Sequence, residues 1–148
     1  MEALASNPAF RTYALCSAIL ALKMLVSAIY TGAQRQRSQG YINAEDARVF
    51  GQAGAAAGNA EAPAVAHALR IQRNDLENIP AFFAIALIYV LLGATPRGAT
   101  VYFWTFTLAR VTHTIAYMRN VQPWRAICYG IGALCVLGMI TQIIGATL

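Results

Sequence analysis

The sequence predicts an all-α integral membrane protein, a bundle of four transmembrane helices in a single domain that covers residues 1–148. Hydrophobic residues make up 58% of the chain and charged residues 11%, whereas soluble domains average about 45–50% and about 25%. A soluble globule of this length has too little interior to bury so much apolar surface. The composition therefore excludes an ordinary soluble domain, a disordered tail and a charged nucleic-acid-binding module.

Four apolar stretches approach the roughly 20 residues that cross a hydrocarbon core of about 30 Å. They cover residues 12–32, 64–92, 99–118 and 126–146. Asn7 and Pro8 suit an N-cap and a first-turn proline before the first span, and Gly93 with Pro96 suits the end of the second. Pro123 marks the start of the fourth span. The short connection between the second and third spans makes them antiparallel neighbours.

The long loop predicted at residues 33–63 separates the first two spans, and Asn43 within it suits the cap of a short helix. The arginines are unevenly divided between the two ends of the predicted bundle. More of them lie on or beside this loop and the connection between the third and fourth spans than at the opposite end. The two sets are Arg35, Arg37, Arg48, Arg119 and Arg125 against Arg11 and Arg97. The positive-inside rule puts the first set in the cytoplasm and both termini on the opposite side. A bacterial inner membrane and an endoplasmic reticulum fit this topology equally well.

The second span carries charged residues that a bilayer rejects unless they face protein or water. Arg70, Arg73, Asn74 and Glu77 follow i, i+3, i+4, i+7 spacing, which places them on one helical face. Their neighbour Asp75 points elsewhere. The stripe lies in the first turns of the span, so it is expected near the cytoplasmic side.

The third and fourth spans add polar residues at the same level. Arg110, His113 and Tyr117 share a face of the third span, and Arg125 and Tyr129 share a face of the fourth. No second ligand accompanies His113 at metal spacing, so we expect no metal site. The spans together predict an arginine-rich pocket that opens toward the cytoplasm.

Two interpretations of this pocket remain open. In the first, the charges are structural ion pairs, with Glu77 bridging Arg73 or Arg110. In the second, the excess of buried positive charge requires an anionic ligand, and guanidinium groups suit carboxylates or a phosphate. Arg35 at the end of the first span extends the set. Lys23, near the middle of that span, is expected to have a structural partner, either helix carbonyls or a carboxylate across an interface.

Several motifs resemble those of the MAPEG family, the membrane-associated proteins in eicosanoid and glutathione metabolism. They are the run RIQRNDLEN at 70–78, the residues at 22–24 and 31–32, the stretch 109–117, and Arg125 with Tyr129. The resemblance covers essentially the whole chain. It implies a homotrimer of four-helix subunits in the lipid bilayer, with glutathione bound between neighbouring subunits near the cytoplasmic side.

The resemblance also implies residue roles. The residues matched to glutathione binding are Arg35, Arg70, Arg73, Asn74, Glu77, Arg110, His113 and Tyr117. Glu77 would pair with the glutathione ammonium. Arg125 would lie near the sulfur and stabilise the thiolate, with Tyr129 in the same region, and these two are the expected catalytic residues. A lipophilic second substrate would enter from the bilayer.

One departure from the family separates the candidate activities. In the prostaglandin-isomerising members, the position that follows the residue matched to Arg125 is a serine. In this chain the position is Ala126. We therefore expect a glutathione transferase or peroxidase that acts on lipophilic electrophiles or lipid hydroperoxides. The alternatives are a glutathione-dependent prostaglandin isomerase and a non-catalytic lipid-binding scaffold of the same fold. The retained Arg125 and Tyr129 argue against the scaffold.

Overall fold

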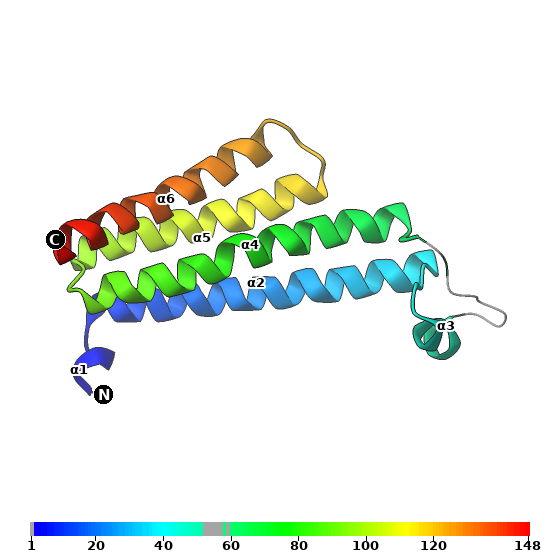
Figure 1. Ribbon diagram of the computed structural model, residues 1–148, viewed down its shortest axis with the longest axis horizontal. Coiled ribbons are helices and arrows are strands. Elements are labelled where there is room, and N and C mark those ends of the chain that lie inside the picture. Colours follow the sequence, from blue (N-terminus) through cyan, green and yellow to red (C-terminus); the bar gives the residue numbers. More distant parts are fainter. Residues whose placement is uncertain (1, 52–57, 59) are drawn as a thin grey trace. The chain divides into compact units, whose positions relative to one another are not determined.

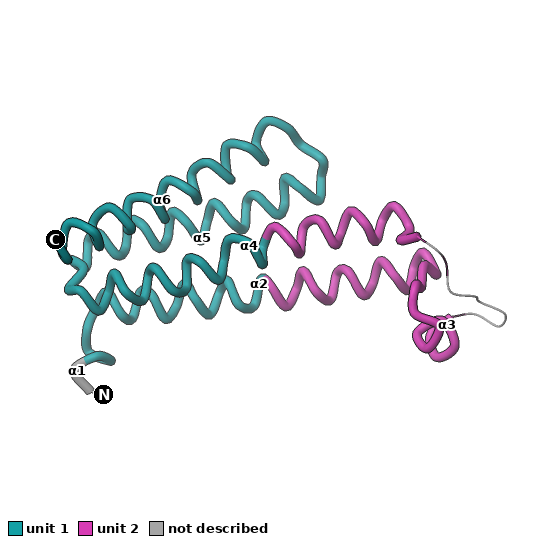
Figure 2. The backbone as a smooth tube through the Cα atoms, in the orientation of Figure 1, with its two compact units in different colours: residues 1–23, 75–148 teal, residues 24–74 magenta. Residues whose placement is uncertain are grey.

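The computed structural model describes residues 2–51, 58 and 60–148, and all the regular structure in this part of the chain is helical. The helices are α1 (Glu2–Ala5), α2 (Pro8–Ser38), α3 (Ala44–Phe50), α4 (Pro63–Leu91), α5 (Pro96–Met118) and α6 (Trp124–Thr147) (Figure 1). The chain divides into two compact units (Figure 2). Unit 1 comprises Met1–Lys23 and Asp75–Leu148, and unit 2 comprises Met24–Asn74.

The helix boundaries agree with the signals in the sequence. The Asn7 side chain caps α2 by accepting a hydrogen bond of 2.9 Å from the backbone of Ala9. Gly93 adopts a left-handed conformation, with φ of +84°, between the end of α4 and the start of α5. Glycine adopts such a φ without a steric penalty, which explains why the chain turns there. α6 begins directly after Pro123, as expected.

The first helix is longer than predicted. The predicted span covered 12–32, whereas α2 runs from Pro8 to Ser38, so the first residues of the predicted loop 33–63 are helical. The apolar stretch ends near Gly32, but the Ala, Gln and Arg residues that follow favour a helix and continue it. The expected short helix is present as α3, with Asn43 at its N-cap position.

In the part of the chain that the structure describes, three helices are long and apolar enough to cross a membrane, namely α2, α4 and α6. The third predicted span, α5, is not among them, because Arg97, Arg110 and His113 make it more polar. Its 23 residues give a length of about 34 Å at 1.5 Å per residue. Length therefore does not prevent α5 from spanning a bilayer.

Aromatic side chains form the core of unit 1. The rings of Phe82 and Phe106 are stacked with centroids 4.2 Å apart, and Phe103 meets Phe82 edge-on at 5.7 Å. Tyr13 of α2 contacts Phe103 at 6.1 Å. These contacts join α2, α4 and α5, and they fix which face of α4 turns inward.

Gln142 of α6 forms hydrogen bonds with one tyrosine of α4 and one of α5. Tyr89 donates to Gln142 Oε1 at 2.9 Å, and Gln142 Nε2 donates to Tyr102 Oη at 2.8 Å. Gly138 makes room for the Tyr102 ring, since a Cβ there would lie 2.7 Å from it. These bonds therefore hold α4, α5 and α6 together near the first turns of α5, away from Arg110 and His113.

Unit 2 contains the last turns of α2, the short helix α3 and the first turns of α4 (Figure 2). Tyr41, buried with 4% exposure, lies in the connection between α2 and α3 and donates to the Phe50 carbonyl at 3.1 Å. The backbone N–H of Gly58 donates to the Tyr41 carbonyl at 2.8 Å. These bonds give the segment after α2 a defined path.

Candidate functional site

The charged residue that lies deepest on α4 is Asp75, with 1% exposure. Its carboxylate forms an ion pair with the Lys23 ammonium of α2, within unit 1. The expected carboxylate partner of Lys23 across a helix interface is therefore confirmed. Asp75 also points away from the stripe of Arg70, Arg73 and Glu77, as the spacing indicated.

Arg110 of α5 is completely buried. Its Nη2 donates to Asn78 Oδ1 at 3.0 Å, and its guanidinium lies 5.4 Å from the centroid of the Tyr129 ring. A Cβ on Gly132 of α6 would lie 3.1 Å from Arg110 Nε. The glycine thus lets the guanidinium pack directly against the α6 backbone, beside one of the two expected catalytic residues.

Asn78, which the sequence pattern did not single out, is a hydrogen-bond partner of Arg110. It lies three residues after Asp75, so both side chains project from the same face of α4. Asp75 meets Lys23 and Asn78 meets Arg110. The signal was the shared i, i+3 spacing of two polar residues within a mainly apolar face.

Three of the expected site residues meet where α5 ends and α6 begins. His113, with 3% exposure, contacts the Tyr117 ring edge-on at a centroid separation of 5.7 Å. Arg125 lies over the same ring, with Cζ 4.4 Å from its centroid. With its amide oriented to satisfy both groups, Gln122 accepts from Arg125 at 3.2 Å (Nε) and 2.6 Å (Nη2). The Arg125 guanidinium is thus held by an aromatic face and an amide oxygen.

The predicted stripe on α4 turns outward in the single chain. Arg70, Arg73 and Glu77 are exposed and Asn74 is half-buried. Arg110 donates to Asn78, and the expectation that Glu77 bridges Arg73 or Arg110 stays a prediction. The physical reason for the outward stripe is the helical phase, because the aromatic core of unit 1 turns the opposite face of α4 inward.

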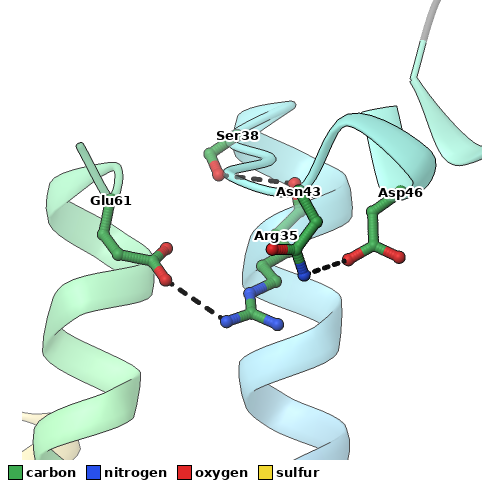
Figure 3. Close-up of polar contacts among 5 residues, drawn as sticks. All are labelled: Arg35, Ser38, Asn43, Asp46 and Glu61. Atoms are coloured by element: carbon green, nitrogen blue, oxygen red, sulfur yellow. Dashed lines mark hydrogen bonds and ion pairs between the residues drawn. The ribbon is translucent and has the colours of Figure 1, made fainter. Parts of the chain in front are cut away.

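Arg35 lies in unit 2, where its Nη2 donates to Glu61 Oε1 at 3.2 Å (Figure 3). The side chains are 37% and 22% exposed, respectively. A pocket of about 380 Å³ adjoins Arg35, with lining residues from α2, from α3 and from the connection between them. The lining includes Ile29, Ala33, Tyr41, Phe50, Arg35 and Asp46. The pocket is thus mainly apolar, with one cation and one carboxylate.

Comparison with known proteins places this geometry in context. Residues 13–145 match the model of the MAPEG family. The chain belongs to the MAPEG family. Prostaglandin E synthase of Macaca fascicularis is 37% identical over 140 residues, covering 94% of this chain and 90% of that protein. The Homo sapiens prostaglandin E synthase is 36% identical with the same coverage. Microsomal glutathione S-transferase 1 of Homo sapiens is 33% identical over 141 residues, or 94% of this chain and 91% of that protein.

Membership of the MAPEG family confirms the resemblance found in the motifs. The match spans α2 to α6, so it covers both the core of unit 1 and the Arg35 region of unit 2. MAPEG proteins are membrane proteins, and α2, α4 and α6 have the length and apolarity that a bilayer requires. The chain is accordingly a membrane protein.

Proposed function

We propose that this chain is a membrane-bound glutathione transferase or peroxidase that acts on lipophilic electrophiles or lipid hydroperoxides. The observation that carries the proposal is a MAPEG chain in which Arg125 is held over Tyr117, one turn of α6 before Tyr129. A relative with 33% identity is named microsomal glutathione S-transferase 1. The family and the position of the arginine both favour thiol chemistry.

The side chains of this protein complement the charges of glutathione, which carries two carboxylates and one ammonium. Arg70 and Arg73 are exposed, and the half-exposed Arg35 adjoins a pocket, so guanidinium donors are accessible to carboxylates. Glu77 is exposed on α4, the helix of Arg70 and Arg73, and its carboxylate suits the glutathione ammonium. We propose that these residues bind the tripeptide, and that Asn74, Arg110, His113 and Tyr117 also bind it. The whole set is taken from the match to the MAPEG motifs.

Glutathione supplies the thiolate that attacks the second substrate. Free thiols have a pKa of about 8.5, so a nearby cation raises the reactive fraction at neutral pH. Arg125 remains protonated and therefore stabilises the negative charge rather than removing a proton. Tyr129 offers a hydroxyl donor to the same sulfur, and its ring rests on the buried Arg110 guanidinium.

The second substrate is proposed to be lipophilic. The pocket of about 380 Å³ beside Arg35 has apolar walls that include Ile29 and Phe50. Apolar walls favour a lipophilic substrate.

Glutathione is proposed to bind between the subunits of a homotrimer. Arg73 and Glu77 belong to a helix apolar enough to span a membrane, yet they are exposed on the single chain. Each charge facing lipid costs about 2.5–3.5 kcal/mol on insertion scales, so such residues face protein or water. A neighbouring copy of the chain, with the ligand between the copies, removes this cost.

We also propose that α5 is a fourth span and that both termini lie opposite the cytoplasm. α5 contacts α4 and α6 along its length through Phe103, Arg110 and Tyr102. An isolated α5 outside the bilayer would lose these contacts. The arginines at the α2 and α5 ends favour the cytoplasm for the polar end of the bundle.

The test is turnover of chlorodinitrobenzene and of an organic hydroperoxide by the detergent-solubilised chain with glutathione. Wild type should turn over at least one of them. Arg125→Ala should lower kcat/KM by about 10²-fold, as removal of an oxyanion donor does elsewhere. Arg119→Ala is the matched control, since Arg119 is exposed at the end of α5. Glutathione binding without any turnover would favour a scaffold instead.

A glutathione-dependent prostaglandin isomerase is the second candidate. It is favoured by the prostaglandin E synthases that are 36% and 37% identical to this chain. Ala126 argues against it, because the resemblance to the family implies a serine at this position in the isomerising members. An isomerase assay with a prostaglandin endoperoxide separates the two candidates.

A further inference from the structure

Arg35, a proposed ligand for a glutathione carboxylate, already has an anionic neighbour in the chain. Its Nη2 donates to Glu61 Oε1 at 3.2 Å, from the last turns of α2 to the residues just before α4 (Figure 3). This bond uses one of the five N–H groups of the guanidinium. Glu61 therefore takes one donor of the guanidinium and neutralises part of the charge that would attract the carboxylate of a ligand.

The contact is a weak one. Both side chains are partly exposed, at 37% and 22%, and ion pairs in contact with water contribute little to stability. The second carboxylate oxygen, Glu61 Oε2, is buried and accepts no hydrogen bond from the described residues. The pair is thus a single hydrogen bond between partly exposed side chains, which a ligand carboxylate can replace at little cost to the stability of the chain.

The local charge also opposes an incoming anion. Asp46 lines the same pocket as Arg35, and its carboxylate accepts a hydrogen bond of 3.2 Å from Asn43 (Figure 3). Asp46 is thus associated with Arg35 through the shared pocket and Glu61 through the ion pair. Neutralising Glu61 would remove one of these negative charges and reduce the repulsion of a ligand carboxylate.

We infer that Glu61 competes with the anionic substrate for Arg35 and so sets the affinity of this chain for glutathione. The inference rests on the proposed function, because it needs glutathione to be the ligand of Arg35. Glu61 is then a residue that lowers the affinity of the site for glutathione. Arg35 alone, without this neighbour, would bind the tripeptide more tightly.

Calorimetry with glutathione on the full chain in detergent tests the inference. Glu61→Gln removes the charge and keeps an acceptor oxygen, and Glu61→Ala removes both. Competition predicts that both variants bind glutathione about two- to fivefold more tightly than wild type, the range expected for an exposed ion pair. The gain should shrink at high salt, since salt screens exposed charges.

Glu45→Gln is the matched control, because Glu45 is exposed in the first turn of α3 and loses the same charge. Its affinity should equal that of wild type. In an Arg35→Gln background the gain from Glu61→Gln should disappear. A glutathione ester that lacks the carboxylate bound by Arg35 should likewise show no gain.

The outcomes separate this inference from the proposed function. Unchanged or weaker binding by Glu61→Gln, with wild type still binding glutathione, overturns the inference and leaves the function intact. Weaker binding by Glu61→Ala alone identifies Glu61 as an orienting partner of Arg35, which also overturns it. If no variant binds glutathione, the proposed function fails and the inference fails with it.

Discussion

The guanidinium carbon of Arg125 lies 4.4 Å from the centroid of the Tyr117 ring. A cation over an aromatic face is attracted by the negative face of the ring, which holds the guanidinium in one orientation. Tyr117 comes from the last turns of α5 and Arg125 from the first turn of α6. The ring therefore fixes the proposed thiolate-stabilising residue relative to α5.

This relationship predicts that the ring of Tyr117 matters separately from its hydroxyl. Tyr117→Leu should lower kcat by about two- to fivefold, the range for one exposed cation–π contact. Tyr117→Phe keeps the ring and should leave kcat near that of wild type, with any loss appearing in the KM for glutathione. Steady-state kinetics with chlorodinitrobenzene measures both. Equal kcat values for the two variants would remove the positioning role of the ring.

The ion pair between Lys23 and Asp75 predicts a strong asymmetry between single and double substitutions. Asp75→Asn leaves the Lys23 ammonium buried beside a neutral amide, and breaking a buried pair in this way costs about 3–5 kcal/mol. Replacing both residues, as Lys23→Met with Asp75→Leu, removes this pair but also takes away a carboxylate that interacts with the fully buried Arg110 guanidinium, so it should recover only part of that loss. Thermal unfolding in detergent compares the variants. A double variant no more stable than Asp75→Asn would contradict this prediction.

The ends of the helices were predictable because they depend on local chemistry. Asn7 with Pro8, Gly93 with Pro96, and Pro123 act within a few residues of their own positions, and each marks a boundary in the structure. The end of α2 was missed for the opposite reason. An apolar window ends where hydrophobicity ends, whereas the polar residues before Ser38 still favour a helix.

The direction of the polar face of α4 depends on packing and was not predictable from spacing alone. Both Arg70–Arg73–Glu77 and Asp75–Asn78–Phe82 follow helical spacing. The second face turns inward, because Phe82 stacks on Phe106 and Asn78 meets Arg110. The partner of Arg35 was equally hidden, since Glu61 lies 26 positions away in the sequence.

Gly132 predicts a steric test of the buried Arg110. A Cβ at this position would lie 3.1 Å from Arg110 Nε and Nη2, and the fully buried guanidinium has little room to move. Overpacking at Gly132→Ala costs about 1–3 kcal/mol and the helix propensity of alanine returns up to about 1 kcal/mol, so the free energy of unfolding should fall by up to about 2 kcal/mol. Gly130→Ala is the matched control on the same helix, since a Cβ there meets nothing within 4 Å. It should be neutral or stabilising by up to about 1 kcal/mol.

Thermal unfolding of the two glycine variants in the same detergent decides the point. If Gly132→Ala is as stable as Gly130→Ala, the Arg110 guanidinium is free to shift, and α6 does not hold it. The Tyr129 ring would then lack a fixed support. Comparison of kcat for the two variants shows whether that support reaches the reaction.

Ala126 predicts how the activity is divided between transfer and isomerisation. It lies between Arg125 and the turn that carries Tyr129, and it is exposed in the first turn of α6. The resemblance to the family implies a serine hydroxyl at this position in the isomerising members, so wild type should convert a prostaglandin endoperoxide slowly. Ala126→Ser adds the hydroxyl beside the guanidinium and should raise isomerase kcat/KM by about tenfold, or roughly 1.4 kcal/mol in activation free energy.

The measurement is the rate of prostaglandin E formation with glutathione, alongside chlorodinitrobenzene turnover by the same preparations. Ala126→Val is the control, because it changes the volume at the site without adding a donor. Transferase activity should persist in Ala126→Ser, since Arg125 and Tyr129 are unchanged. Rapid isomerisation by wild type would instead mean that the Arg125 guanidinium suffices for this reaction without a neighbouring hydroxyl, and the second candidate function would then replace the first.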